Sequence, residues 1–428
     1  MREYCEILRL VWPLALGMVN NAVMQFVDRA FLARESIYSL EAALPASMLA
    51  LTIAGFFQSV TAYSGTFVAQ FHGAEDSRGE KSSYAAGTII AVISGILALA
   101  LIPAGRLAMP LMSDNPEVLA RANIYYAIIM TGTIATCGHI AASSYFTGIG
   151  KTSRVFWVSL AGNILNIALD YLLIFKAGLG IAGAAYATVI SSMMQWIALG
   201  IMIKWEKPTL ELIGRILRFG IPSGGYTILN IISFTIFVFI TGKVGDVEFA
   251  VSNACFSINW LLIAPMEGFA IGASTLVGQH QGRRDSEGAR RVLKKILVLA
   301  LSFVLLLSTL AVIFNHSILS LFAPTGAEST LFYSLGFKLV LLMAAWQIFD
   351  AADVVVAGAL KGAGDTKFVM WWMVAVAFGI WLPLVWIIKA THNTMPALWA
   401  TMVVYVVIIC AGEILRWRRG KWSAIKLT

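Results

Sequence analysis

The sequence is poor in charged residues: Asp, Glu, Lys and Arg make up 13% of its 428 residues, against about 25% in soluble domains. It also has only four cysteines, Cys5, Cys137, Cys255 and Cys410, none of them in a closely spaced pair. This scarcity excludes a disulfide framework and a cysteine-based zinc site. The glycine-rich turns lack a Walker lysine pattern, and no pairing of residues suggests hydrolysis. We therefore expect neither an enzyme nor a bound cofactor.

Hydrophobic residues, in contrast, make up 59% of the chain, and the mean hydropathy is +0.80. These values indicate a polytopic membrane protein in contact with the lipid bilayer. The net charge of +8 does not point to nucleic acid, because the placement of Lys and Arg matters more in a membrane protein. The first apolar run, residues 10–32, is too long for a signal-peptide core and lacks a small-residue cleavage site.

Twelve apolar runs are long enough to cross a bilayer as helices, which takes about 20 residues each. They lie near residues 10–32, 42–71, 84–104, 122–147, 155–175, 181–203, 219–241, 250–279, 292–314, 330–360, 367–388 and 397–416. The sequence therefore predicts an all-α integral membrane protein with twelve transmembrane helices.

The basic residues indicate the orientation of these helices. Most of the 31 Lys and Arg residues fall in the N-terminus, the even-numbered loops and the C-terminal tail, with dense groups at residues 283–295 and 416–426. By the positive-inside rule these segments face the cytoplasm. We expect a multi-pass protein of the cell membrane (the inner or plasma membrane) with both termini cytoplasmic.

The two halves of the chain resemble each other. LRFGIP at residues 217–222 echoes LRLVWP at 8–13, an offset of 209, and GAGDT at 362–366 echoes GIGKT at 148–152. Each copy holds six spans, so both copies share one orientation and should be related by a pseudo-two-fold axis along the membrane normal. We expect an N-terminal six-helix lobe (residues 1–203), a cytoplasmic linker (204–218) and a C-terminal six-helix lobe with a basic cytoplasmic tail (219–428).

Polar residues recur on one face of the fifth predicted span. Asn163, Asn166 and Asp170 are spaced i, i+3 and i+7, which places them on the same side of a helix. A carboxylate inside a membrane span costs about 2.5–3.5 kcal/mol on insertion scales, so Asp170 is a candidate functional group. The two asparagines could instead join helices as buried polar groups.

Two other spans of the N-terminal half carry similar polar stripes, formed by Asn21, Gln25 and Asp28 in the first span and by Thr188 and Gln195 in the sixth. In the predicted orientation, Asp28, Asp170 and Thr188 can meet at one depth. Two carboxylates cannot both stay ionised cheaply at low dielectric, so we expect a proton or a cation between them. Pro13 in the first span removes a backbone hydrogen bond, which either permits bending or makes a static kink.

The C-terminal half carries Glu267 in the eighth span and Asp350 and Asp353 in the tenth. Asp350 and Asp353 are one helical turn apart, so their titrations should be coupled. We expect Asp350 to face a cavity and Asp353 to support it. Glu267 either serves a substrate cation or second ion site, or faces water near the cytoplasm. None of the intramembrane acids has an acid at the equivalent repeat position, which favours a specialised site over a scaffold role.

In combination, these stretches resemble the multidrug and toxic compound extrusion (MATE) family, in its NorM-type branch. The matching stretches are FVD at residues 26–28 after Pro13, residues 68–73, 163–188, 275–282 with Arg290-Arg291, and 360–366. The resemblance covers the whole chain. It implies two six-helix lobes around a V-shaped cavity and alternating access as a drug/H⁺ or drug/Na⁺ antiporter.

By this resemblance, Asp28 matches the carboxylate of the family's first span, and Asn166, Asp170 and Thr188 match its partners in an N-lobe cation site. Asp350 resembles the acid of the tenth span. The chain departs from the NorM pattern in having no acid in its seventh span and Glu267 in its eighth. The resemblance thus implies no metal beyond a transiently bound Na⁺ at these acids.

The first functional hypothesis is a monomeric exporter of amphipathic, cationic drugs coupled to H⁺ or Na⁺. The second is a flippase for lipid-linked precursors, whose cavity should be rich in Arg and Lys; here the charges within the spans are mostly acids, with Lys338 the main exception. The third is a channel or receptor without coupled transport, which the duplicated six-span plan disfavours. The sequence names neither the physiological substrate nor the ion.

Overall fold

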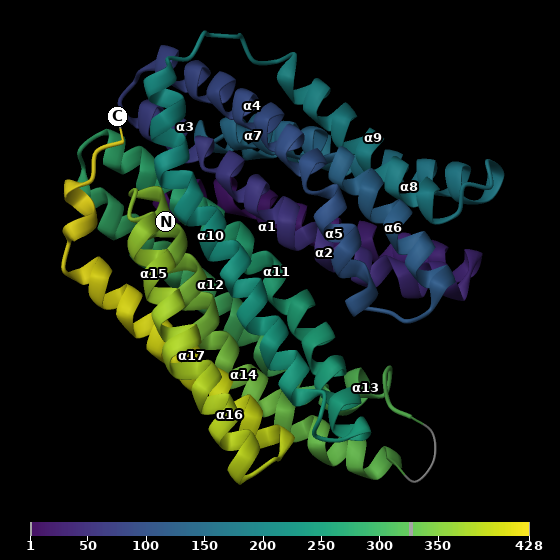
Figure 1. Ribbon diagram of the computed structural model, residues 1–428. Helices are drawn as coiled ribbons and strands as arrows, with labels where there is room; N and C mark the ends of the chain where they lie inside the picture. The colour runs from purple at the N-terminus through teal and green to yellow at the C-terminus, as the bar shows by residue number, and fades with distance from the viewer. Residues whose placement is uncertain (1, 325–327, 428) are drawn as a thin grey trace. The chain divides into compact units, whose positions relative to one another are not determined.

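The computed structural model describes residues 2–324 and 328–427, and within them every regular element is a helix (Figure 1). The helices of the first half are α1 (Arg2–Glu35), α2 (Ile37–Ala62), α3 (Ser64–Gly73), α4 (Ser77–Ala100), α5 (Ile102–Ala108), α6 (Pro116–Thr131), α7 (Thr133–Gly148), α8 (Thr152–Asp170) and α9 (Ile181–Gly200). Those of the second half are α10 (Leu210–Thr241), α11 (Asp246–Gly282), α12 (Ser286–Ile313), α13 (Asn315–Leu319), α14 (Glu328–Gly362), α15 (Thr366–Val376), α16 (Leu382–Thr391) and α17 (Met395–Arg418). Four short turns, 3₁₀ or π in type, complete them: η1 (Met109–Leu111), η2 (Tyr171–Lys176), η3 (Ala377–Trp381) and η4 (Lys421–Ala424).

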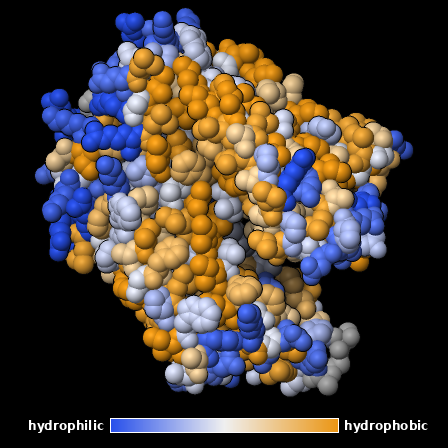
Figure 2. All heavy atoms as spheres, in the orientation of Figure 1, coloured by the Kyte–Doolittle hydropathy of each residue, from blue (hydrophilic) through white to orange (hydrophobic). Residues whose placement is uncertain are grey.

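The predicted all-α membrane fold is confirmed. In the described part of the chain, 11 helical segments are long and apolar enough to cross a bilayer, and α6 with α7 forms a twelfth if the pair counts as one span. That pair is bent by 43° at Gly132, where a side chain would collide with Val189 of α9. Figure 2 shows apolar side chains over the flanks of the helices and hydrophilic residues gathered toward their ends.

Local sequence explains where several helices begin and continue. The Asp76 carboxylate accepts a hydrogen bond from the Gly79 backbone N–H (2.9 Å) at the start of α4, and Asn115 caps α6 in the same way. Such caps satisfy backbone donors that have no partner within the helix. Pro13 lies inside α1 and its repeat equivalent Pro222 inside α10, and both helices continue through the proline.

The chain forms two compact units. The N unit comprises residues 9–228 and 278–285, and the C unit comprises residues 2–8, 229–277 and 286–426. In the N unit, α2 packs on α6, α4 on α7, and α9 on both α7 and α8; in the C unit, α14 packs between α12 and α17. The division falls inside α10 and α11, and the lobe boundaries drawn from the linker stay a prediction.

Candidate functional site

The polar face of α8 is buried in the N unit. Asn163, Asn166 and Asp170 are 4%, 0% and 0% exposed, although they lie on a helix whose other faces are apolar. A close approach of α9 allows this, because a Cβ atom at Gly162 would collide with the Gln195 side chain. The fifth predicted span therefore presents its polar groups to α1 and α9 rather than to lipid.

Asn166 is the centre of the arrangement. With its amide oriented to satisfy its neighbours, Asn166 Nδ2 donates to Asp28 Oδ1 (3.1 Å) and to Asp170 Oδ2 (3.3 Å). Its Oδ1 atom accepts a hydrogen bond from the Thr188 backbone N–H (3.2 Å). One amide side chain thus links α1, α8 and α9.

The two carboxyl groups of this centre lie within hydrogen-bonding reach of each other, Asp28 from α1 and Asp170 from the last turn of α8. Neither carboxylate can donate a hydrogen bond to the other unless a proton is added. Asp170 Oδ1 is buried and has no hydrogen-bond partner among the described residues. Both facts point to a small positively charged ligand, a proton or a metal cation, between the two groups.

The remaining polar residues of the three stripes have other contacts. Asn163 Nδ2 donates to Asn21 Oδ1 (2.9 Å), a second link between α8 and α1. Thr188 Oγ1 donates to the Ala184 carbonyl oxygen of its own helix (3.1 Å), so its backbone, not its hydroxyl, contacts Asn166. Gln25 is exposed.

Two features beside the acid pair had no clear sequence signal. The Tyr125 side chain, on α6, lies close enough to interact electrostatically with Asp28 and Asp170, and it lies near Ser47 of α2. In sequence it was one of 12 tyrosines in a largely apolar chain. Directly after Asp170 the helix widens into the π-helical turn η2 (Tyr171–Lys176). Such turns often occur at functional sites.

The structure places the three predicted acids of the C-terminal half in different environments. Asp353 is 5% exposed, Asp350 is half-buried and Glu267 is exposed. Gln347, on the same stripe as Asp350, is fully buried, donates to Asn259 Oδ1 (2.9 Å) and accepts from Ser308 Oγ (2.8 Å). The stripe therefore begins inside the C unit and becomes more accessible toward Asp350.

Sequence reasoning missed two charged residues of the C unit, Glu413 on α17 and Lys361 at the end of α14. Glu413 is 0% exposed, and its carboxyl lies within hydrogen-bonding reach of Asp353. Lys361 interacts electrostatically with Glu413, Glu267 and Asp353. A lone Glu within the twelfth predicted span was a usable signal, but it was not singled out from the sequence.

The nearest basic residue to Glu413 along α17, Arg416, forms an ion pair with a different acid. Arg416, one turn further along α17, binds Asp365 through Nε (2.6 Å) and Nη2 (3.2 Å). Its guanidinium is therefore engaged with another acid. Both carboxylate oxygens of Glu413 are buried without a hydrogen-bond donor among the described residues.

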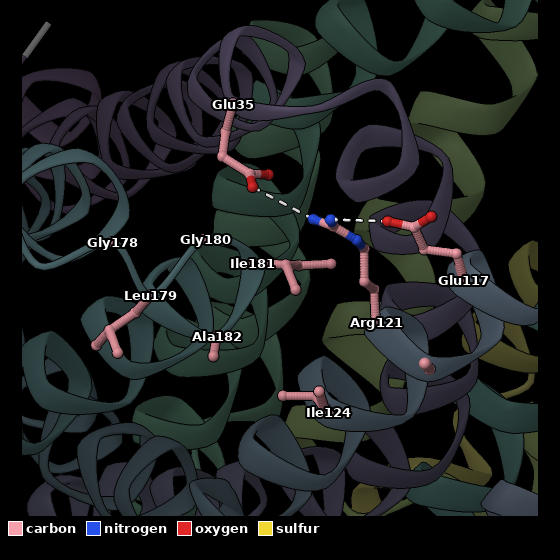
Figure 3. Close-up of a pocket in the computed structure, with 10 residues that line it drawn as sticks. Glu35, Glu117, Arg121, Ile124, Gly178, Leu179, Gly180, Ile181 and Ala182 are labelled. Carbon is pink, nitrogen blue, oxygen red and sulfur yellow. Dashed lines mark hydrogen bonds and ion pairs between the residues drawn. The ribbon is translucent and has the colours of Figure 1, made fainter.

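A cavity of about 430 Å³ lies in the N unit at the end of α1 (Figure 3). Figure 3 shows the Arg121 guanidinium between two carboxylates: Nη1 contacts Glu35 Oε1 (3.2 Å) and Nη2 contacts Glu117 Oε1 (3.0 Å). Arg121 Nη1 also donates to Ser39 Oγ (2.7 Å). The ion pairs and the hydrogen bond of Arg121 link α1, α2 and α6. Arg121 lies one helical turn before Tyr125 on α6.

The described residues contain no group of three or more His, Cys, Asp or Glu side chains that could hold a metal ion. A transient monovalent cation at a pair of carboxylates would need no such group.

Comparison with known proteins identifies relatives along the whole chain. A family model described as MatE matches residues 13–172 and 222–387, two stretches that begin at Pro13 and Pro222, the same offset as the sequence repeat. The chain is 24% identical over 442 residues to the probable multidrug resistance protein NorM of Acinetobacter baylyi, covering 98% of this chain and 96% of that protein. It is 26% identical over 410 residues to the multidrug resistance protein PmpM of Pseudomonas aeruginosa, covering 89% and 83%.

Solved structures share the fold. A crystal structure of MATE in complex with MaL6 matches with a TM-score of 0.87 at 19% sequence identity, covering 97% of this chain and 96% of that chain. The eukaryotic MATE transporter AtDTX14 matches with a TM-score of 0.85 at 17% identity, covering 99% and 97%. At these identities the likeness establishes the architecture alone.

Proposed function

The chain belongs to the MatE family, and on that premise we propose that it is a multidrug exporter that exchanges amphipathic organic cations for H⁺ or Na⁺ by alternating access. The resemblance found in the sequence is thereby confirmed at the level of the family, and the chain is embedded in a membrane by several spans. The relatives named multidrug resistance proteins support the export of small molecules.

The observation that carries the proposal is the Asp28–Asn166–Asp170 centre. Two carboxyl groups and one amide, contributed by α1 and α8, converge here, and one buried carboxylate oxygen lacks a partner among the described residues. The exposed Arg29 interacts electrostatically with Asp28 but forms no ion pair with either carboxyl group. A proton or a Na⁺ ion supplies the missing positive charge. Because α1, α8 and α9 all contribute, ion binding and release change the free energy of keeping these helices together.

A substrate cation is best accommodated by the more accessible acids of the C unit. Asp350 is half-buried and Glu267 is exposed, and the two interact electrostatically. An organic cation placed near both would neutralise their repulsion. A lipid-linked pyrophosphate would instead be repelled, which is why export of cations is the function we propose.

The test is efflux of an organic cation, such as ethidium, from proteoliposomes with a pH gradient and a Na⁺ gradient imposed separately. We expect one of the two gradients to drive efflux against the substrate gradient, and liposomes without a gradient to show only leakage. Efflux that depends on neither gradient would contradict coupled export.

We also propose that both termini face the cytoplasm in the inner or plasma membrane. The observation behind this is the concentration of Arg and Lys in residues 283–295 and 416–426. Single cysteines placed at Arg284 and Lys421 should be labelled by a membrane-impermeant thiol reagent only after the cells are opened. Labelling from outside intact cells would reverse the orientation.

A further inference from the structure

A second cavity, of about 250 Å³, lies in the C unit where α12 begins and α17 ends. Three basic side chains line it, Arg290 and Lys294 from α12 and Arg418 from α17. No Asp or Glu is among the described residues that line the cavity. The positive charge of this cavity is therefore not balanced from within.

The other wall of the cavity is apolar. Leu297 continues the α12 face by one turn, and Val356 and Ile414 come from α14 and α17. The cations lie at the helix ends, and the apolar side chains extend from them along the spans. This gradient from charge to apolar surface matches a molecule with a charged head and a hydrocarbon tail.

The tail after α17 packs against two residues that line this cavity, Trp417 and Arg290. Trp422 is 0% exposed, stacks on Trp417 with ring centroids 4.1 Å apart, and donates from Nε1 to the Trp417 carbonyl oxygen (2.9 Å). The turn between them depends on Gly420, whose φ is +70°. A Cβ atom at Gly420 would lie 2.9 Å from Arg290 Nη2, so the turn packs directly against one of the three cations.

We propose that this cavity binds the head group of an anionic phospholipid. The lipid phosphate would receive charge-assisted hydrogen bonds from Arg290, Lys294 and Arg418. Its first acyl carbons would lie against the apolar wall. Basic pockets between transmembrane helices at the cytoplasmic side bind such head groups, whereas free phosphate would make no use of the apolar wall. The cavity borders the helix pair α14 and α17 that holds Asp353 and Glu413, so an occupied cavity would stabilise that pair.

The test is a lipid titration of the purified, full-length chain followed by native mass spectrometry. We expect phosphatidylglycerol to be retained more strongly than phosphatidylcholine, and Arg290→Ala to weaken phosphatidylglycerol binding about fivefold, the effect of one cation at a membrane surface. Arg291→Ala is the matched control, since Arg291 is equally exposed and adjacent but does not line the cavity. Gly420→Ala should weaken binding without removing a charge, because it strains the turn that holds Arg290.

The outcomes separate the specific site from general attraction. Equal losses in Arg290→Ala and Arg291→Ala would overturn the site, and so would equal retention of the two lipids. Inorganic phosphate that binds with the same dependence on Arg290 would show a phosphate site instead of a lipid site. Thermal unfolding of each variant checks that the chain is still folded, and Arg290→Lys, which keeps the charge, should retain most of the binding.

Discussion

The two units both bury a pair of carboxyl groups, but they compensate for them differently. In the N unit, Asp28 and Asp170 share a neutral amide, that of Asn166. In the C unit, Asp353 and Glu413 have a lysine near enough to interact with both electrostatically, Lys361. The basic residue beside the N-unit pair, Arg29, interacts electrostatically with Asp28 but is exposed, whereas Lys361 is partly buried and interacts with both acids of the C-unit pair. The N-unit pair therefore gains more from a cation bound from outside the protein.

From this difference we expect the two pairs to have different functions, ion coupling in the N unit and helix stabilisation in the C unit. A site whose neighbouring basic side chain is exposed to solvent gains more from binding H⁺ or Na⁺, so it is suited to coupling. A site that already contains an ammonium group repels a further metal cation and holds its helices together instead. In the C unit, the acids left for a substrate are then Asp350 and Glu267.

The largest expected effect is at the N-unit pair. Asp28→Asn and Asp170→Asn should each reduce gradient-driven export about 100-fold, toward the upper range of coupling energies between two sites. The double variant should be little worse than either single one, because both remove the same ion. Export is measured in proteoliposomes, with Asp114→Asn, an exposed loop carboxylate, as control. Near-normal export in either variant would remove that residue from the coupling role.

Next in size is the loss of Lys361. Lys361 interacts electrostatically with the buried Glu413 and is itself partly exposed, so we expect Lys361→Met to destabilise the chain by about 2 kcal/mol, less than the roughly 3–5 kcal/mol for breaking a fully buried ion pair. Adding Glu413→Gln should restore part of that stability, because the uncompensated carboxylate is gone. Thermal unfolding of the two single variants and the double variant measures this coupling. Strictly additive effects would show that the C unit does not depend on this pairing.

A smaller effect, about tenfold, is expected for the acids of the tenth span. Asp350→Asn should weaken export more than Asp353→Asn, because the half-buried Asp350 is the more accessible to a substrate, and the double variant should resemble Asp350→Asn. Measuring the export activity of the three variants as a function of pH shows which of the two acids has the larger role. If Asp353→Asn fails while Asp350→Asn exports normally, the two roles are reversed. If neither matters, coupling rests on the N unit alone.

The smallest expected effect is at the hydrogen bond between Asn163 and Asn21. Asn163→Ala should lower stability by about 1 kcal/mol, the net contribution of one such bond, and leave the ion dependence of export unchanged. Thermal unfolding and export are measured together. A change in the ion dependence of export would show that Asn163, like Asn166, belongs to the coupling site. Asn163 would then not be a purely structural amide.

Much of the fold could be predicted because the membrane restricts the chain to helices. The apolar runs located the spans, including the fourth, although nothing in its composition indicated the 43° bend at Gly132. At Gly132 the helix pair approaches Val189, which is distant in sequence, too closely for a side chain. The family was recognised from its ordered motifs and is confirmed.

The candidate site could be predicted only where its residues share one helix. The spacing of Asn166 and Asp170 placed both on one face of α8, but the spacing could not show that Asn166 bridges to Asp28 or that Thr188 contributes its backbone. Lys361 and Glu413 come from different helices, so no periodicity connects them. The assignment of all these residues to ion coupling or substrate binding stays a prediction.

The most direct measurement of the central claim is ion release on substrate binding. Ethidium is added to the purified protein in weakly buffered solution, and released protons and Na⁺ are counted with a pH dye and a Na⁺ electrode. We expect the native chain to release one of these ions, and Asp170→Asn to bind ethidium but release none. The same release from Asp170→Asn as from the native chain would contradict the claim that the Asp28–Asn166–Asp170 centre is the coupling site.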